Sequence, residues 1–256
     1  MKTKKITQLL KKNTYLTSLK NNQKVKLILN IGSIPRGDFI EGWSDIDLLI
    51  VVESINLQLF KTIYEYQNFL EKKSKIKIGI EIILTDHLQK MTKGKKWAVS
   101  SLKILKQFHP NNRQNFKRGI LYQNNKFKLT MPPKKFFENL DLKEYLISAK
   151  SAIVKILGTY NIKDNKKYIL RKLIKNSLLV MQTKLLVDSG ELTDNFDLVL
   201  RKYKNKYSFD INVIQKSFKK RFLWKTISNK EISLLEIEEN WNFFQLLVNN
   251  TTNTAK

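Results

Sequence analysis

Two short apolar runs separated by a glycine-containing loop are the strongest constraint on how this chain can fold. Residues 25–31 are aliphatic and β-branched and end at Gly32, which predicts a strand that enters a tight turn. The second apolar run, residues 48–52, begins directly after a pair of aspartates. Residues two apart on a strand point to the same face, so Asp45 and Asp47 are expected to lie side by side.

The turn and loop between these strands have the residues of a phosphate-binding backbone. Such a turn can aim backbone N–H groups and the Ser33 hydroxyl at an anion. The loop that follows holds Arg36 and Gly37, which suits close approach to a phosphate with one guanidinium in reach. Phosphates on one side and carboxylates on the other leave a gap suited to Mg²⁺, which prefers oxygen ligands.

A third acid lies on a later predicted strand. Residues 75–84 have strand composition, and Glu81 is their only acid. A carboxylate buried in a parallel or mixed sheet is costly unless it meets a metal ion or a partner. We therefore interpret Glu81 as an active-site group. The competing interpretation is an edge-strand glutamate that faces water.

Taken together, these motifs resemble the DNA polymerase β-type nucleotidyltransferase superfamily over residues 25–122, and within it the minimal and antibiotic nucleotidyltransferases. The resemblance rests on the Gly-Ser turn, the Asp-x-Asp pair after eleven intervening residues, and the later strand acid. Asn30 departs from the pattern, because the family usually has an aromatic or apolar residue there.

The resemblance implies a metal-dependent transfer of NMP from an NTP to a hydroxyl, with pyrophosphate leaving. The acids would be catalytic and would bind two Mg²⁺, and Glu81 would either share a metal or accept the proton of the attacking hydroxyl. The implied residues are Asp45, Asp47 and Glu81 for catalysis and metal binding, and Gly32, Ser33, Arg36 and Ser44 for nucleotide binding.

Periodicity predicts an α/β (α+β) chain with a small mixed-sheet domain followed by an all-α helical bundle. We place the catalytic domain at residues 1–130 and the bundle at 134–256, with Pro132 and Pro133 at the boundary. Expected helices of the first domain cover 6–19, 57–70 and 97–108. Those of the bundle cover 136–157, 165–189, 193–203, 211–224 and 232–248.

The composition limits the remaining possibilities. The chain has 256 residues and no cysteine, which excludes disulfides and thiolate zinc sites. No run has the roughly 18 apolar residues of a membrane span, and the start lacks a signal-peptide core, so we expect a cytoplasmic protein without a membrane partner. The sequence does not indicate an oligomeric state.

The chain is strongly basic, with 48 Lys and Arg against 22 acids and a formal net charge of +26. Only six of the basic residues are arginine, which fits a low-GC coding bias as well as function. Residues 87–137 hold eleven lysines, two arginines and no acid. A basic band after the Glu81 strand would attract a polyanion in a salt-dependent manner.

The sequence leaves several classes of acceptor open. The basic stretch favours RNA, such as a tRNA end. The antibiotic enzymes suggest an aminoglycoside or lincosamide instead, for which the bundle offers acids at Glu138, Asp141, Glu144, Asp188, Glu191, Asp194 and Asp197. Protein nucleotidylation and a non-catalytic nucleic-acid binder are further alternatives. A HEPN-type ribonuclease is set aside, because both histidines, His87 and His109, precede the bundle.

Overall fold

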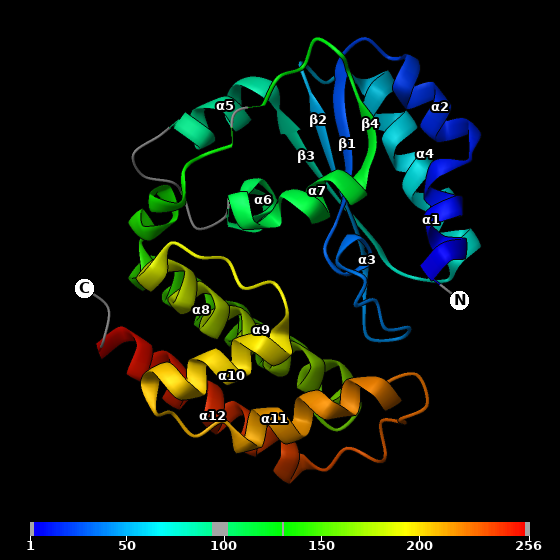
Figure 1. Cartoon of the computed structure of the whole chain (residues 1–256). Coiled ribbons are helices and arrows are strands. Elements are labelled where there is room, and N and C mark those ends of the chain that lie inside the picture. The colour runs from blue at the N-terminus through cyan, green and yellow to red at the C-terminus, as the bar shows by residue number, and fades with distance from the viewer. Residues whose placement is uncertain (1–2, 94–101, 130, 254–256) are drawn as a thin grey trace. The chain divides into compact units, whose positions relative to one another are not determined.

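The computed structural model of the chain describes residues 3–93, 102–129 and 131–253. The chain divides into two compact units (Figure 1). The first comprises residues 1–94 and 103–132, and the second comprises residues 95–102 and 133–256. The predicted fold class is confirmed, because a small mixed sheet is followed by a mostly helical region.

The first unit is built on a four-stranded sheet in the order β3-β2-β1-β4. Its strands are β1 (Val25–Ile31), β2 (Ile46–Val52), β3 (Ile78–Leu84) and β4 (Ile120–Gln123). β1 pairs antiparallel with β2 and β4, whereas β2 pairs parallel with β3. The central strands β1 and β2 are almost fully buried, as their aliphatic composition requires.

Three helices pack with one face of the sheet to form the core of this unit (Figure 1). They are α1 (Thr3–Lys11), α2 (Thr14–Asn21) and α4 (Leu57–Ser74). We predicted a single helix over 6–19, and the structure divides it at Asn13. The Asn13 side chain accepts the Leu16 N–H and begins α2, which is the usual role of asparagine at a helix N-terminus.

Short helices make up the rest of the unit: α3 (Ser33–Arg36), α5 (Thr85–Lys93), α6 (Leu102–Leu105) and α7 (Arg113–Gly119). Residues 94–101 lie outside the described part, so only the end of the helix predicted over 97–108 is seen. That end is α6 followed by the 3₁₀ turn η2 (Lys106–Phe108), and Pro110 begins a second turn, η3 (Pro110–Asn112).

The second unit is all-helical around α9 (Lys166–Ser189), which is buried on most of its circumference. Around α9 lie α8 (Leu142–Thr159), α10 (Phe196–Tyr207), α11 (Asn212–Lys219) and α12 (Leu234–Asn253). Two predicted helices are shorter than expected. Residues 134–139 form the 3₁₀ turn η4 (Lys134–Asn139), and α11 continues as η5 (Lys220–Leu223).

The first helix of the second unit, α8, begins later than predicted for a local reason. The Asp141 side chain accepts the Glu144 N–H and starts α8 at Leu142, so the pattern that begins at Phe136 belongs to two elements. Within the described ranges, no helix has both the length and the apolar character needed to span a membrane.

Candidate active site

The turn after β1 depends on glycine for its backbone conformation. Gly32 has φ +83°, a region that side chains other than glycine rarely adopt. A Cβ at this position would also lie 3.4 Å from Oδ2 of Asp47. Ser33 follows as the first residue of α3, and Gly37, with φ +84°, ends that helix. The chain therefore brings the Gly32 turn within contact distance of the Asp47 carboxylate.

Gly79 on β3 makes room for the Asp47 carboxylate. Asp47 pairs with Ile31 of β1 and with Gly79 of β3. A Cβ on Gly79 would lie 2.8 Å from Oδ1 of Asp47, closer than real Cβ contacts allow. The Asp47 backbone is held by Asn30, whose side-chain amide donates to the Asp47 carbonyl oxygen at 3.0 Å. Buried Asn30 thus helps position the aspartate instead of filling an apolar core site.

Glu81 lies on the same face of the sheet as Asp47. The parallel register pairs Asp47 with Gly79, and Glu81 follows two residues later on β3. The premise that Glu81 is buried is wrong: β3 is an edge strand, and the Glu81 side chain is 46% exposed. Its interpretation as an active-site group therefore rests on what it faces and not on burial.

Glu81 and Asp47 face one lysine. The Lys103 ammonium lies 3.1 Å from Oδ1 of Asp47 and 3.1 Å from Oε1 of Glu81. Partial burial alone would lower the pKa of Lys103, but the charges and hydrogen bonds of the two carboxylates outweigh burial and raise it. At neutral pH, Lys103 is therefore a protonated cation held between two predicted catalytic acids.

Within the described ranges, no group of three or more His, Cys, Asp or Glu side chains is arranged to hold a metal ion. The donor set nevertheless suits a divalent cation, because Asp47 and Glu81 present hard carboxylate oxygens to one shared positive charge. Asp45 is partly buried immediately before β2 and is not among the contacts of Lys103. The structure thus brings two of the three predicted acids together.

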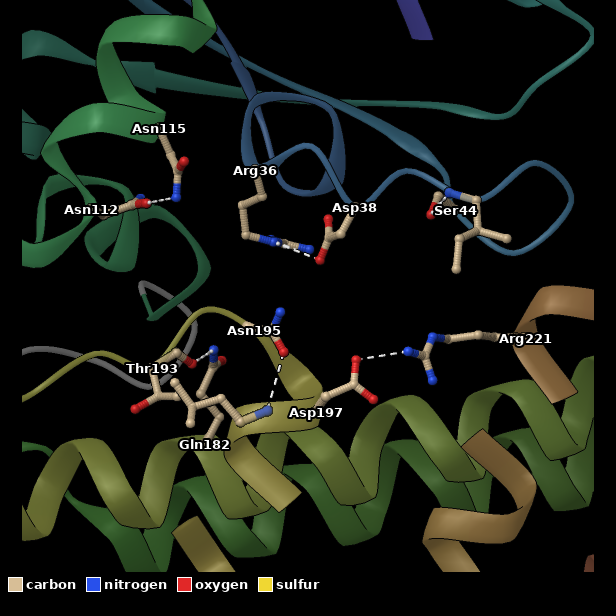
Figure 2. A network of polar contacts seen from close by, with 12 residues as sticks. Arg36, Asp38, Ser44, Asn112, Asn115, Gln182, Thr193, Asn195, Asp197 and Arg221 are labelled. Atoms are coloured by element: carbon tan, nitrogen blue, oxygen red, sulfur yellow. Dashed lines mark hydrogen bonds and ion pairs between the residues drawn. The ribbon is translucent and has the colours of Figure 1, made fainter. Parts of the chain in front are cut away.

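The other predicted nucleotide-binding side chains are engaged within the loop before β2, as Figure 2 shows. The Arg36 Nε donates to Oδ2 of Asp38 at 3.2 Å. The Ser44 hydroxyl oxygen accepts the Ile40 N–H at 3.1 Å, and Ser44 itself is mostly buried. Both residues help to close this loop, and their role toward a nucleotide stays a prediction.

The sequence did not single out Lys103 or Gly79, and it marked Asn30 only as a departure from the family pattern, without a role at the site. Lys103 is one of the eleven lysines of the acid-free stretch, and nothing in its neighbourhood in the sequence distinguishes it from the others. Gly79 carried a weak signal, since glycine inside a strand often marks a close approach by another group. Part of the basic stretch, residues 94–101 and 130, lies outside the described residues.

Comparison with known families adds an independent line of evidence. Residues 12–119 match the family model described as a nucleotidyltransferase domain, and this segment includes the Gly32 turn, the paired aspartates, Glu81 and Lys103. None of the curated proteins compared matches the chain. Residues 12–119, which include three of the four strands of the mixed sheet, are thus similar to a nucleotidyltransferase domain.

Proposed function

We propose that this protein transfers a nucleoside monophosphate from an NTP to a hydroxyl acceptor on RNA such as tRNA. The observation that carries the proposal is the pairing of Asp47 and Glu81 across one cation, next to the Gly32 turn, inside a nucleotidyltransferase domain. Two hard carboxylates beside a phosphate-binding type of turn suit phosphoryl chemistry.

In the proposed reaction the acceptor oxygen forms a bond to the α-phosphorus, and the bond from that phosphorus to the β-phosphate oxygen breaks. Pyrophosphate leaves with that bond's electron pair. Glu81 is a suitable base for the acceptor proton, since half of its side chain reaches solvent. Gly32, Ser33, Arg36 and Ser44 would bind the nucleotide.

Asp45, Asp47 and Glu81 are the residues that would hold Mg²⁺, two ions in the proposed site. When bound, the metal would supply neutralisation of the phosphate charge and orientation of the attacking and leaving oxygens. Lys103 occupies the position between Asp47 and Glu81, so its ammonium must move aside when a metal binds there.

The ion pairs of the second unit argue against a polycationic antibiotic as acceptor. An aminoglycoside site needs free carboxylates, and several of the acids that could provide them already have partners. Asp188 pairs with Lys184, Glu191 with Lys134 and Asp197 with Arg221. Asp141 caps α8 with its side chain. The formal net charge of +26 instead favours an acceptor rich in phosphate.

Incubation with each labelled NTP in turn, together with total tRNA, cell protein or an antibiotic panel, tests the proposal. Label is expected in the RNA pool, with pyrophosphate released in equal amount. The Asp47→Asn protein is the control and should transfer no label. Label in the antibiotic or protein pool would contradict RNA as the acceptor and would support the transfer reaction. No label in any pool would contradict the reaction itself.

A further inference from the structure

A pocket of about 310 Å³ lies between α10 and α11, wholly within the second unit. Its apolar residues, Leu200, Ile211 and Phe218, are almost completely buried and form its floor. Three exposed basic side chains line it as well: Arg201, Lys204 and Lys219. We call this the α10–α11 pocket. Its volume is at the small end of the roughly 300–1,000 Å³ typical of ligand sites, which suits one nucleotide-sized molecule.

Within the part of the chain that the structure describes, no carboxylate pairs with the three basic side chains of the α10–α11 pocket. Among the described residues, Arg201, Lys204 and Lys219 have no carboxylate partner, in contrast to the paired lysines of α9 and η4. Three cations around one small pocket repel one another, and an anionic ligand would relieve that repulsion. The pocket therefore selects for an anion and against a polycation.

Asp197 is the one acid among the described residues that line the pocket, and an ion pair with Arg221 of η5 neutralises its charge. The Arg221 guanidinium donates to Oδ2 of Asp197 at 2.7 Å, as Figure 2 shows. Arg221 is fixed in place because it stacks 3.6 Å from the Phe218 ring centre and donates to the Phe218 carbonyl oxygen. This ion pair fixes the Asp197 carboxylate and cancels its charge. The pocket therefore keeps a net charge of +3, carried by Arg201, Lys204 and Lys219.

The remaining polar groups suit a nucleoside. Asn205 and Gln215 line the pocket with exposed side-chain amides, which can both donate and accept hydrogen bonds at a base edge or a ribose hydroxyl. The apolar floor offers a surface for a base, and the cations offer contacts for its phosphate. A simple inorganic anion would leave that floor unused.

We propose that the α10–α11 pocket binds a nucleoside phosphate, either a free nucleotide or one nucleotide unit of an RNA strand. This deepens the proposed function, on which its biological role rests, because it assigns a nucleotide-containing substrate to the second unit. The binding itself requires no transfer reaction, so it can be measured even when nucleotidyl transfer is absent.

The experiment uses the full chain carrying Asp47→Asn, in buffer with EDTA to remove metal-dependent binding at the catalytic acids. Adenosine, AMP and a 5′-phosphorylated adenosine trinucleotide are titrated by calorimetry. The pocket variant adds Arg201→Gln and Lys204→Gln. The matched control adds Lys150→Gln and Lys155→Gln, two exposed cations of α8 away from the pocket lining. Both variants remove two positive charges.

We expect the pocket variant to bind phosphorylated probes about tenfold more weakly or worse, because charge-assisted contacts are lost, while the control variant is unchanged. The salt slope for the trinucleotide should also fall by about 1.4 if two phosphate contacts are removed. Weaker binding of AMP alone in the pocket variant would identify a free nucleotide as the ligand, and weaker binding of the trinucleotide alone would identify an RNA strand. Weaker binding of both would support a site for a nucleoside phosphate from either source.

An equal loss of affinity in the pocket and control variants would overturn the proposal. So would a loss of affinity for adenosine as large as that for AMP, or an absence of binding by the Asp47→Asn parent protein. Lys219→Gln alone replaces the double variant if circular dichroism shows that the latter is unfolded. A nucleotidyl-transfer assay of the natural sequence runs separately, so failure of the pocket and failure of the proposed reaction are read from different measurements.

Discussion

Asp47 is held from three directions by residues that are far apart in the sequence. Asn30 fixes its backbone carbonyl, Lys103 pairs with its carboxylate, and Gly79 leaves the space that the carboxylate occupies. The Asn30 hydrogen bond and the space at Gly79 do not depend on Lys103, so they fix the position of Asp47 before substrate binds, which is the property that electrostatic catalysis requires.

Asp47→Asn is therefore expected to reduce nucleotidyl transfer by about 10²-fold or more, since a preorganised charged group at the reaction centre is removed. Its melting temperature should stay close to that of the natural protein, because the amide is nearly isosteric with the carboxylate. The assay is release of labelled pyrophosphate. Glu53→Gln is a suitable control, because that exposed carboxylate follows the same strand and pairs with Lys26. Full activity of Asp47→Asn would exclude Asp47 from the chemistry.

Lys103→Met is expected to destabilise the protein at neutral pH, where it leaves Asp47 and Glu81 as an uncompensated carboxylate pair. The pKa of Lys103 is raised in the folded state. Its stabilising effect is thus fully present below the unfolded value of about 10.4 and is lost as the pH rises through the folded value. Urea unfolding of both proteins should give a constant stability difference from pH 7 to 9 that shrinks above pH 10.5.

The control for this measurement is Lys126→Met, an exposed lysine of the same unit. Its stability difference from the natural protein should be small throughout that pH range. A Lys103→Met difference that grows at high pH would contradict the assigned contacts with the two carboxylates.

Two helices, α7 and α8, each contain a glycine near their C-terminus, and the two glycines differ in how closely other parts of the chain approach them. A Cβ on Gly119, at the end of α7, would lie 2.1 Å from the backbone oxygen of Asn30 on β1. A Cβ on Gly158, in the last turn of α8, would meet nothing within 4 Å. The close contact of α7 with β1 therefore depends on glycine, whereas α8 has no such requirement.

Gly119→Ala is expected to cost at least about 3 kcal/mol of unfolding free energy, the upper part of the range for overpacking, because the obstacle is backbone and cannot rotate away. Gly158→Ala, the matched control, should stabilise the protein by up to about 1 kcal/mol through better helix propensity. Chemical denaturation of both variants gives the two values. A near-neutral Gly119→Ala would show that α7 lies farther from β1 than the structure places it.

Helix caps explain three of the differences between the expected and observed element boundaries. Asn13, Asp141 and Asn195 each accept the backbone N–H of the residue three positions later and begin a helix. Such residues are visible in the sequence, but they are also common in loops and turns. Only the packing of the apolar face that follows selects which of them start a helix.

For the whole molecule, the dominant property is its positive charge. The formal net charge of +26 is expected to give salt-dependent binding to RNA, with the association constant falling about twentyfold from 50 to 200 mM salt for three phosphate contacts on a single strand. Fluorescence anisotropy with a labelled oligonucleotide measures it. Competition by polyglutamate distinguishes binding to any polyanion from binding specific to nucleic acid. Binding that is insensitive to salt would argue against RNA as the partner.

The sequence by itself determined the strands, the turn at Gly32, the acids that follow and the change to an all-helical region. These follow from local periodicity and residue type, which act within a few positions along the chain. The tertiary structure decided what those acids face. Lys103 meets Asp47 and Glu81 because the chain folds back after β3, and β3 leaves Glu81 half exposed because it is an edge strand. Strand order and long-range contacts depend on how the elements pack, and no local pattern in the sequence encodes them.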